Sequence, residues 1–77
     1  MARIAKYEPL APGTDKVHGP VLCGWKTFEK NGEKLVQLDT YGSPDRKFRG
    51  KVSQSIQLDE ASAGELMGIL RRAFPNL

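Results

Sequence analysis

The dipeptide Asn31-Gly32 is the feature that most constrains how this chain can fold. It lies between two runs rich in apolar and β-prone residues, in the stretch VLCGWKTFEKNGEKLVQLDTY over residues 21–41. This pattern is typical of a β-hairpin with a two-residue type I′ turn. Such a turn also sets the register, which pairs oppositely charged residues with each other and apolar residues with each other. The predicted pairs are Lys30–Glu33, Glu29–Lys34, Phe28–Leu35, Thr27–Val36, Lys26–Gln37 and Trp25–Leu38.

The same register divides the hairpin into two faces, because successive side chains of a strand alternate. One face should form the core and holds Cys23, Trp25, Thr27, Val36 and Leu38. The other face mixes polar groups with two aromatic rings: Lys26, Phe28, Leu35, Gln37, Asp39 and Tyr41. Two interpretations of this second face stay open. Either Phe28 and Leu35 only cover each other near the hairpin tip, or the face is a binding surface.

A further strand and a helix follow. Residues 52–58, VSQSIQL, alternate strictly, which predicts a half-buried strand. One side holds Val52, Gln54, Ile56 and Leu58, and the other holds the uncharged, hydrogen-bonding Ser53, Ser55 and Gln57. The next run predicts a helix with Asp59 as its N-cap and Pro75 as its stop signal. Its apolar stripe, which can cover the sheet, consists of Ala63, Leu66, Met67, Leu70 and Phe74. We therefore predict an α+β fold, with a small curved antiparallel β-sheet of three or four strands followed by one C-terminal α-helix packed on it.

Residues 1–20 break any regular period with five prolines and glycines, so we predict a flexible N-terminal arm, or a strap loosely docked on the domain, there. A single sheet-plus-helix domain should cover residues 21–77, and a fourth strand can come from the arm or from residues 42–51. Cys23 is the only cysteine, which favours a reducing compartment. The chain has no apolar run suited to a transmembrane helix or a signal peptide, so we expect no membrane partner and a cytoplasmic location.

A chain of 77 residues buries too little surface to be comfortably stable alone, and it has no disulfide to help. We therefore expect a homodimer. Gly64 and Gly68 stand about one helical turn apart and leave a bare strip that lets another backbone approach. Close packing on the chain's own sheet is the alternative explanation of these glycines. The predicted dimer contact consists of Gly64, Gly68 and Ile69.

No constellation of residues predicts catalysis. His18 lies in the irregular arm, where an exposed loop residue is the expectation, and Cys23 falls on the predicted core face, where thiols are inert. The stretch GSPDRKFRG lacks the strand-to-helix context and the Lys-Ser/Thr ending of a phosphate-binding loop. We therefore expect a non-enzyme with no metal, no cofactor and no small-molecule substrate.

Residues 42–51, GSPDRKFRGK, form what we call the basic segment. The whole formal net charge of +3 comes from one aspartate and four cations in it: Asp45, Arg46, Lys47, Arg49 and Lys51. Cations around an aromatic side chain are typical of a loop that follows phosphates, and a ring stacked on an unpaired base contributes about 1–3 kcal/mol. Tyr41 and Phe48 can supply such rings. In the alternative interpretation Phe48 packs into the core and the cations are merely solvated.

The run from Leu35 to Phe74 resembles the single-stranded-DNA-binding domain of the transcriptional positive cofactor four family, whose bacterial members are small stand-alone proteins. The shared pattern is a strand ending in an acidic residue and an aromatic, a crossing with Pro and Gly-Lys, an Ile–x–Leu strand and an acidic helix cap. Here these are Asp39, Tyr41, Pro44, Gly50-Lys51, Ile56, Leu58 and Asp59-Glu60. The resemblance implies a curved sheet backed by a helix, dimerising to form a groove for single strands. It also implies binding roles for Lys26, Tyr41, Arg46, Lys47, Phe48, Arg49 and Lys51.

The leading hypothesis from the sequence is a homodimeric, non-catalytic protein that binds single-stranded nucleic acid, in transcription or DNA maintenance. The alternative is a small interaction module or inhibitor that offers its basic loop, or a sheet edge, to an acidic partner protein. A third hypothesis is a structural dimer whose basic segment only aids solubility.

Overall fold

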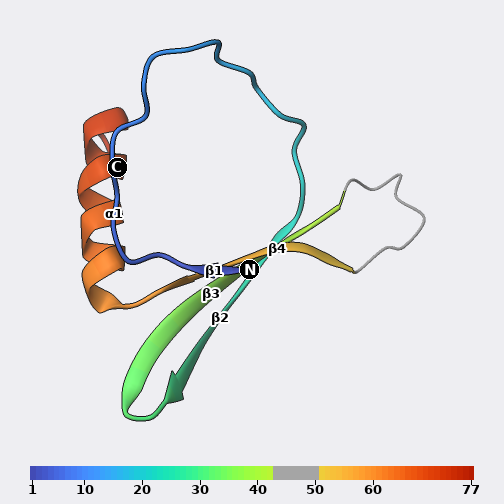
Figure 1. Ribbon diagram of the computed structural model, residues 1–77, viewed down its shortest axis with the longest axis vertical. Helices are drawn as coiled ribbons and strands as arrows, with labels where there is room; N and C mark the ends of the chain where they lie inside the picture. The colour runs from blue at the N-terminus through green and yellow to red at the C-terminus, as the bar shows by residue number, and fades with distance from the viewer. Residues whose placement is uncertain (43–50) are drawn as a thin grey trace.

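The protein is a four-stranded mixed sheet followed by one C-terminal helix, and the sheet is open rather than closed (Figure 1). The computed structural model describes residues 1–42 and 51–77. The strands lie in the order β1-β4-β3-β2. Their bounds are β1 Ala2–Arg3, β2 Cys23–Lys30, β3 Glu33–Tyr41 and β4 Val52–Leu58, and the helix α1 spans Glu60–Ala73. The predicted α+β class is therefore confirmed.

The β2–β3 hairpin has the register that the turn predicts. All six predicted pairs occur, from Lys30 opposite Glu33 to Trp25 opposite Leu38. Asn31 and Gly32 have φ angles of 55° and 77°, the left-handed conformation that a type I′ turn requires at both central positions. The turn therefore determines which side chains share a face of this hairpin.

The predicted strand and helix at the C-terminal end also form. β4 pairs with β3 in the antiparallel direction, and α1 begins directly after Asp59. The Asp59 carboxylate accepts a hydrogen bond of 2.8 Å from the backbone N–H of Ser62. In return the Ser62 hydroxyl accepts one of 3.0 Å from the backbone N–H of Asp59. This capping box satisfies two donors that would otherwise lack partners at the helix start.

The fourth strand comes from the N-terminal arm. β1 pairs with β4 in the parallel direction, with Ala2 opposite Ile56, so the sheet is mixed rather than wholly antiparallel. The backbone N–H of Ile4 donates a bond of 3.0 Å to the carbonyl of Gln57. Further along, the Tyr7 hydroxyl donates a bond of 2.8 Å to the carbonyl of Ser62 in α1. The first residues of the arm therefore belong to the sheet, while flexibility of residues 1–20 stays a prediction.

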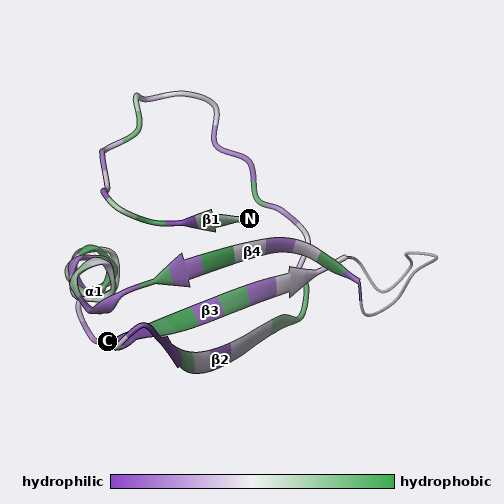
Figure 2. Cartoon of the chain, turned by 60° about the horizontal axis from the view of Figure 1, so that its bottom comes forward, coloured by the Kyte–Doolittle hydropathy of each residue, from purple (hydrophilic) through white to green (hydrophobic). Residues whose placement is uncertain are grey.

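Helix α1 stands at the end of β4 instead of lying across the whole sheet. Figure 2 shows the four strands side by side with α1 viewed along its axis beside the tip of β4. Among the described residues the helix makes its main sheet contact with β4, which β3 separates from β2. Within residues 1–42 and 51–77 the helix therefore leaves the edge strand β2 exposed.

The predicted core face is wrong for its β2 members. Trp25 is 75% exposed, and Cys23 and Thr27 are exposed as well, because α1 does not reach across to β2. Val36 and Leu38 on β3 are half-buried. The buried apolar side chains of the described residues are Leu35 and Leu58, which lie where β3 and β4 meet the start of α1. Two buried leucines make a very small core for a folded domain.

Candidate nucleic-acid interface

One broad face of the sheet carries polar side chains in register across three strands. Gln37 lies between Lys26 on β2 and Gln57 on β4, and Asp39 lies opposite Ser55. Directly paired residues project to the same side of a sheet. We call this surface the polar face and define it by Lys26, Phe28, Gln37, Asp39, Tyr41, Ser55 and Gln57.

A chain of hydrogen bonds links the polar side chains of this face. The Gln57 amide donates to the Gln37 carbonyl oxygen at 2.9 Å, and the Gln37 amide donates to the Asp39 carboxylate at 3.0 Å. The Ser55 hydroxyl donates to the same carboxylate oxygen of Asp39. Ser55 is only 5% exposed, so the network is anchored in the interior of the sheet. The side chains are thus held in fixed orientations before any ligand arrives.

These bonds keep Asp39 ionised. The Ser55 hydrogen bond lowers the pKa of the Asp39 carboxyl most strongly, and the Gln37 bond and the positive charge of Lys26 act in the same direction. Desolvation by burial opposes them without reversing the shift. The polar face therefore presents a fixed negative charge beside the positive charge of Lys26. A polyanion that binds here must keep its phosphates away from Asp39.

The Lys26 ammonium lies 5.6 Å from the centroid of the Phe28 ring, within the range of a cation–π interaction. Phe28 is half-buried and its cross-strand partner Leu35 is buried, so the two side chains cover each other near the hairpin tip. This geometry agrees with the simpler of the two sequence interpretations for this end of the face. The ring of Phe28 is thereby engaged by its neighbours, while Lys26 stays exposed.

Tyr41 provides an aromatic surface at the other end of the polar face. Its ring lies over Gly24, where an added Cβ would come within 3.3 Å of the phenol oxygen and 3.4 Å of a ring carbon. Glycine at position 24 therefore allows the ring to lie close to the backbone of β2. Beside it is a shallow hollow of about 140 Å³, lined by Gly24, Trp25, Lys26, Gln37, Asp39 and Tyr41. This hollow combines a ring, a cation and a carboxylate.

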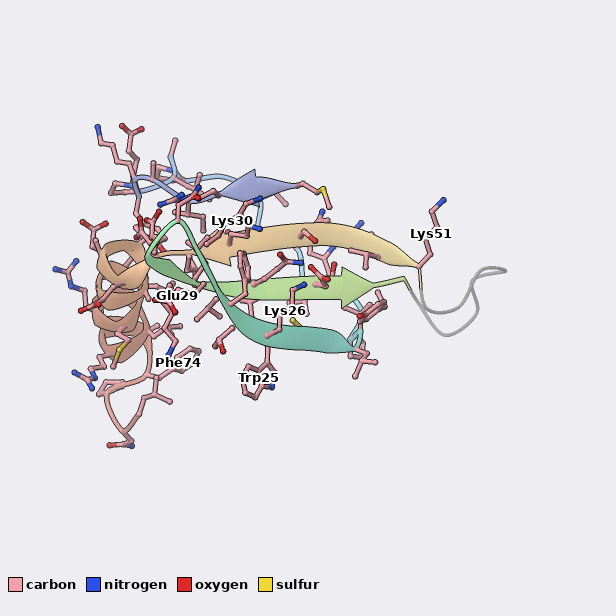
Figure 3. The ribbon with its side chains drawn as sticks, turned by 90° about the horizontal axis from the view of Figure 1, so that it is seen from below. Trp25, Lys26, Glu29, Lys30, Lys51 and Phe74 are labelled. Carbon is pink, nitrogen blue, oxygen red and sulfur yellow. The ribbon has the colours of Figure 1, made fainter. Side chains whose placement is uncertain are left out.

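The basic segment joins the sheet beside Tyr41. Tyr41 is the last residue of β3 and pairs with Val52, the first residue of β4, after a register shift between Thr40 and Tyr41. Lys51 directly precedes Val52 and is exposed. In Figure 3 Lys51 extends from the start of β4, at the end of the sheet away from α1. The remaining predicted contact residues lie outside the described residues: Arg46, Lys47, Phe48 and Arg49.

Three comparisons with known proteins give the same result. No protein-family model matches the chain, and searches of the curated proteins and of the solved structures find no match. The resemblance to the positive cofactor four family therefore rests on the residues quoted for it, and it enters below as a proposal.

Several polar residues of this face were not predicted as site residues. Ser55 and Gln57 follow from the alternation of residues 52–58, but their contacts to Asp39 and Gln37 need the register between β3 and β4. Asp39 itself lies on the face that the hairpin register predicts. The sequence signal that could have predicted this network is the set of polar side chains at alternate positions of β4, opposite the acidic residue Asp39 on β3.

The other residues considered for chemistry are exposed. The burial predicted for Cys23 is wrong: its side chain is exposed, and its Sγ donates a weak bond of 3.6 Å to the carbonyl of Gly24. Its inertness stays a prediction. His18 lies exposed in the arm. Within residues 1–42 and 51–77 no three histidine, cysteine or acidic side chains gather as a metal site would require. The helix found there is too short and too polar to cross a bilayer.

Proposed function

We propose that this chain is a non-catalytic single-stranded nucleic-acid-binding protein that acts as a homodimer. The observation that carries the proposal is the junction at Tyr41. The basic segment, whose charges sum to the net charge of the chain, follows Tyr41 directly in the sequence. The sheet face at this point carries the Tyr41 ring and polar groups that are already linked by hydrogen bonds. Cations of the basic segment would hold phosphates, and the ring of Tyr41 would stack on a base. Lys26 and Lys51 would extend the track of positive charge.

A single strand fits this surface better than a duplex. Reading a duplex through its major groove requires an element such as a basic helix. Helix α1 begins with Glu60, carries Glu65, and has its two arginines, Arg71 and Arg72, in the last turn. A sheet face with a flat ring beside hydrogen-bonding groups instead suits bases that are already unpaired.

The charge of Asp39 gives the proposed binding mode a direction. Phosphates would follow the cations at the end of the sheet where β3 ends and β4 begins. Bases would point towards the polar face, where carboxylate and amide oxygens can accept hydrogen bonds from base N–H groups. We propose binding rather than catalysis because the polar groups of this face are engaged with one another. A role in transcription or DNA maintenance rests on the family resemblance alone.

The homodimer part of the proposal is supported by the size of the core. Leu35 and Leu58 are the buried apolar side chains of the described residues, and none of those residues has a side chain that is wholly removed from solvent. A single core in a chain this short rarely suffices for stability without a staple or a partner. Two copies would also present two polar faces, so that one strand of sufficient length could contact both.

Fluorescence anisotropy of a labelled oligo(dT) tests the nucleic-acid part. The test variant changes Arg46, Lys47, Arg49 and Lys51 to Gln, and we expect it to lose binding while its thermal unfolding stays nearly unchanged. A matched control changes four cations outside the interface to Gln: Lys6, Lys16, Arg71 and Arg72. The control should keep most of its affinity. Equal losses in both variants would show that only the overall charge matters and would contradict a specific interface.

The edge strand β2 favours a second candidate function, a protein-interaction module. β2 spans eight residues, and on the side away from β3 it has no strand partner within the described part of the chain. Such an edge can add a strand from a partner protein. Absence of oligo(dT) binding at low salt, together with capture of an acidic strand-forming peptide, would favour this candidate instead.

A further inference from the structure

Large apolar side chains are exposed on the side of the sheet opposite the polar face. Trp25 on β2 is 75% exposed, Phe74 at the end of α1 is 60% exposed, and Met67 is 50% exposed. Ala63, four residues before Met67 on α1, lines a hollow with Val36 and Leu58, whose side chains project to the same side of the sheet as Trp25. Met67 and Phe74 are seven residues apart, which is about two turns of helix, so Met67 shares that side of α1. All three side chains remain largely open to solvent.

The strands between them continue this surface. Trp25 pairs with Leu38, and Leu38 pairs with Ile56, so the three side chains form a row across β2, β3 and β4. Leu38 and Ile56 are half-buried. We call this surface the apolar face and define it by Trp25, Val36, Leu38, Ile56, Met67 and Phe74.

The charges that β2 and β3 carry on this side of the sheet cancel. By alternation, Glu29 and Lys34 project to the same side as Trp25, and they lie directly opposite each other. The uncompensated cations of the chain belong to the basic segment instead. In a two-fold symmetric contact each patch meets an identical patch, so a face with net charge would repel its own copy. The apolar face avoids this cost.

The exposed area is far larger than a compact monomer would show. The chain exposes 7118 Å², whereas the relation between surface and mass gives about 4700 Å² for a compact protein of 8.5 kDa. The extended residues 8–22 contribute part of this excess, since all of them are exposed. A standard interface removes only about 800 Å² from each partner. The excess is larger than that area, and the exposed side chains of Trp25, Met67 and Phe74 contribute to it.

The size of the core indicates which partner covers the face. If the fold needs its apolar face buried to be stable, the partner that buries this face must be present wherever the chain folds. A second copy of the chain meets this condition. Gly64 and Gly68 strengthen this argument, because an added Cβ at either position would meet nothing within 4 Å. They leave a bare strip on α1, next to Met67, where a second backbone can approach closely.

We propose that the apolar face is the surface through which two copies of this chain associate, and that its burial in the dimer completes the core of each copy. The inference rests on the homodimer part of the proposed function and is independent of the nucleic-acid part. It also changes the predicted dimer contact. Ile69 lies on another side of α1, where it lines a hollow with Tyr7 and Pro9 of the arm, so Met67 and Phe74 take its place.

Trp25 is the only tryptophan of the chain, so the fluorescence of the wild-type protein reports on the environment of this one side chain. Burial in a dimer should shift its emission to shorter wavelength, and dilution should return it to the emission of an exposed indole. Sedimentation over the same concentrations should show the mass changing from two copies to one in parallel. The unfolding temperature should rise with protein concentration, because association stabilises only the folded state. A folded monomer at high concentration with a fixed unfolding temperature would overturn the proposal.

Two variants separate this surface from others. Met67→Glu and Phe74→Ser should raise the dimer dissociation constant at least tenfold. Leu10→Ser, which removes an apolar side chain that is exposed in the arm, should leave it unchanged. If Met67→Glu prevents folding at low concentration but not at high concentration, the coupling of folding to association is supported. A dimer that survives both variants would overturn this interface while leaving the homodimer standing. Oligo(dT) binding, measured on the same samples, reports separately on the nucleic-acid part.

Discussion

The phenol ring of Tyr41 lies over Gly24, diagonally across the pairing of β3 with β2. This contact holds the ring beside the hollow of the polar face. If the ring stacks on a base, Tyr41→Ala should weaken oligo(dT) binding by about 5- to 150-fold, since stacking contributes about 1–3 kcal/mol for each base. Tyr41→Phe should bind nearly as well as the wild type. Fluorescence anisotropy at constant salt measures both variants.

Gly24→Val tests the same contact without changing the ring. A branched side chain at position 24 cannot share space with the phenol, because even its Cβ would lie 3.3 Å from the oxygen. The ring should move off β2, and binding should weaken although every aromatic and charged group is retained. Gly13→Val in the arm is the matched control, since nothing lies within 4 Å of that position. If Gly24→Val binds normally, the orientation of Tyr41 has no part in recognition.

The Ser55–Asp39 hydrogen bond predicts how stability responds to acid. The pKa of Asp39 is lower in the folded protein than the value of about 3.9 in an unfolded chain. The stability that it contributes is therefore fully present above that value and is lost as the pH falls through the folded-state pKa. Ser55→Ala should raise the pKa of Asp39 and weaken this acid dependence. NMR titration of the Asp39 carboxyl and urea unfolding between pH 7 and pH 3 measure both effects.

Ser53→Ala is the control for the acid experiment. The Ser53 hydroxyl bonds to the hydroxyl and carbonyl of Thr40, not to a carboxylate. Removing it should leave the pKa of Asp39 in place. An unshifted Asp39 pKa in Ser55→Ala would mean that Ser55 does not hold the charge.

The hairpin turn predicts a stability change of known sign. Gly32 has a φ of 77°, and an L-residue in that region costs about 1–2 kcal/mol. Gly32→Ala should therefore lower the free energy of unfolding by about that amount in chemical denaturation. Gly19→Ala in the arm should not, because its backbone does not adopt the left-handed conformation and nothing lies within 4 Å. A neutral Gly32→Ala would argue against the type I′ turn.

Arg3 secures the start of the arm. Its guanidinium pairs with Glu33 beside the hairpin turn, and it also lies 3.2 Å from Asp59 at the helix cap. Arg3→Gln should loosen β1, so the Ile4 amide, which bonds to Gln57, should exchange faster with deuterium. Lys6→Gln, which removes an exposed ion pair with Glu8, should leave that exchange rate unchanged. Unaltered exchange in Arg3→Gln would show that backbone pairing alone holds the arm.

The elements that could be predicted from the sequence are those fixed by local chemistry. Asn31-Gly32 set the hairpin register, alternation predicted β4, and Asp59 marked the helix start. Alternation tells which side chains share a face but not what covers that face, so the exposure of Trp25 could not be inferred. The arm was one of two predicted sources of a fourth strand, but two residues carry no periodic signal, so β1 itself could not be located. The bond from Ser55 to Asp39 needed the β3–β4 register, which no short turn specifies.

The salt dependence of oligo(dT) binding by the wild-type protein tests the central proposal most directly. If the four cations of the basic segment contact phosphates, a plot of log affinity against log salt concentration should fall with a slope of about −2.8 for each protomer. Anisotropy titrations at several salt concentrations between roughly 0.05 and 0.3 M provide the measurement. A slope near −2.8 is the predicted result. A flat plot, or no binding at the lowest salt, would contradict the proposal that this chain binds single-stranded nucleic acid.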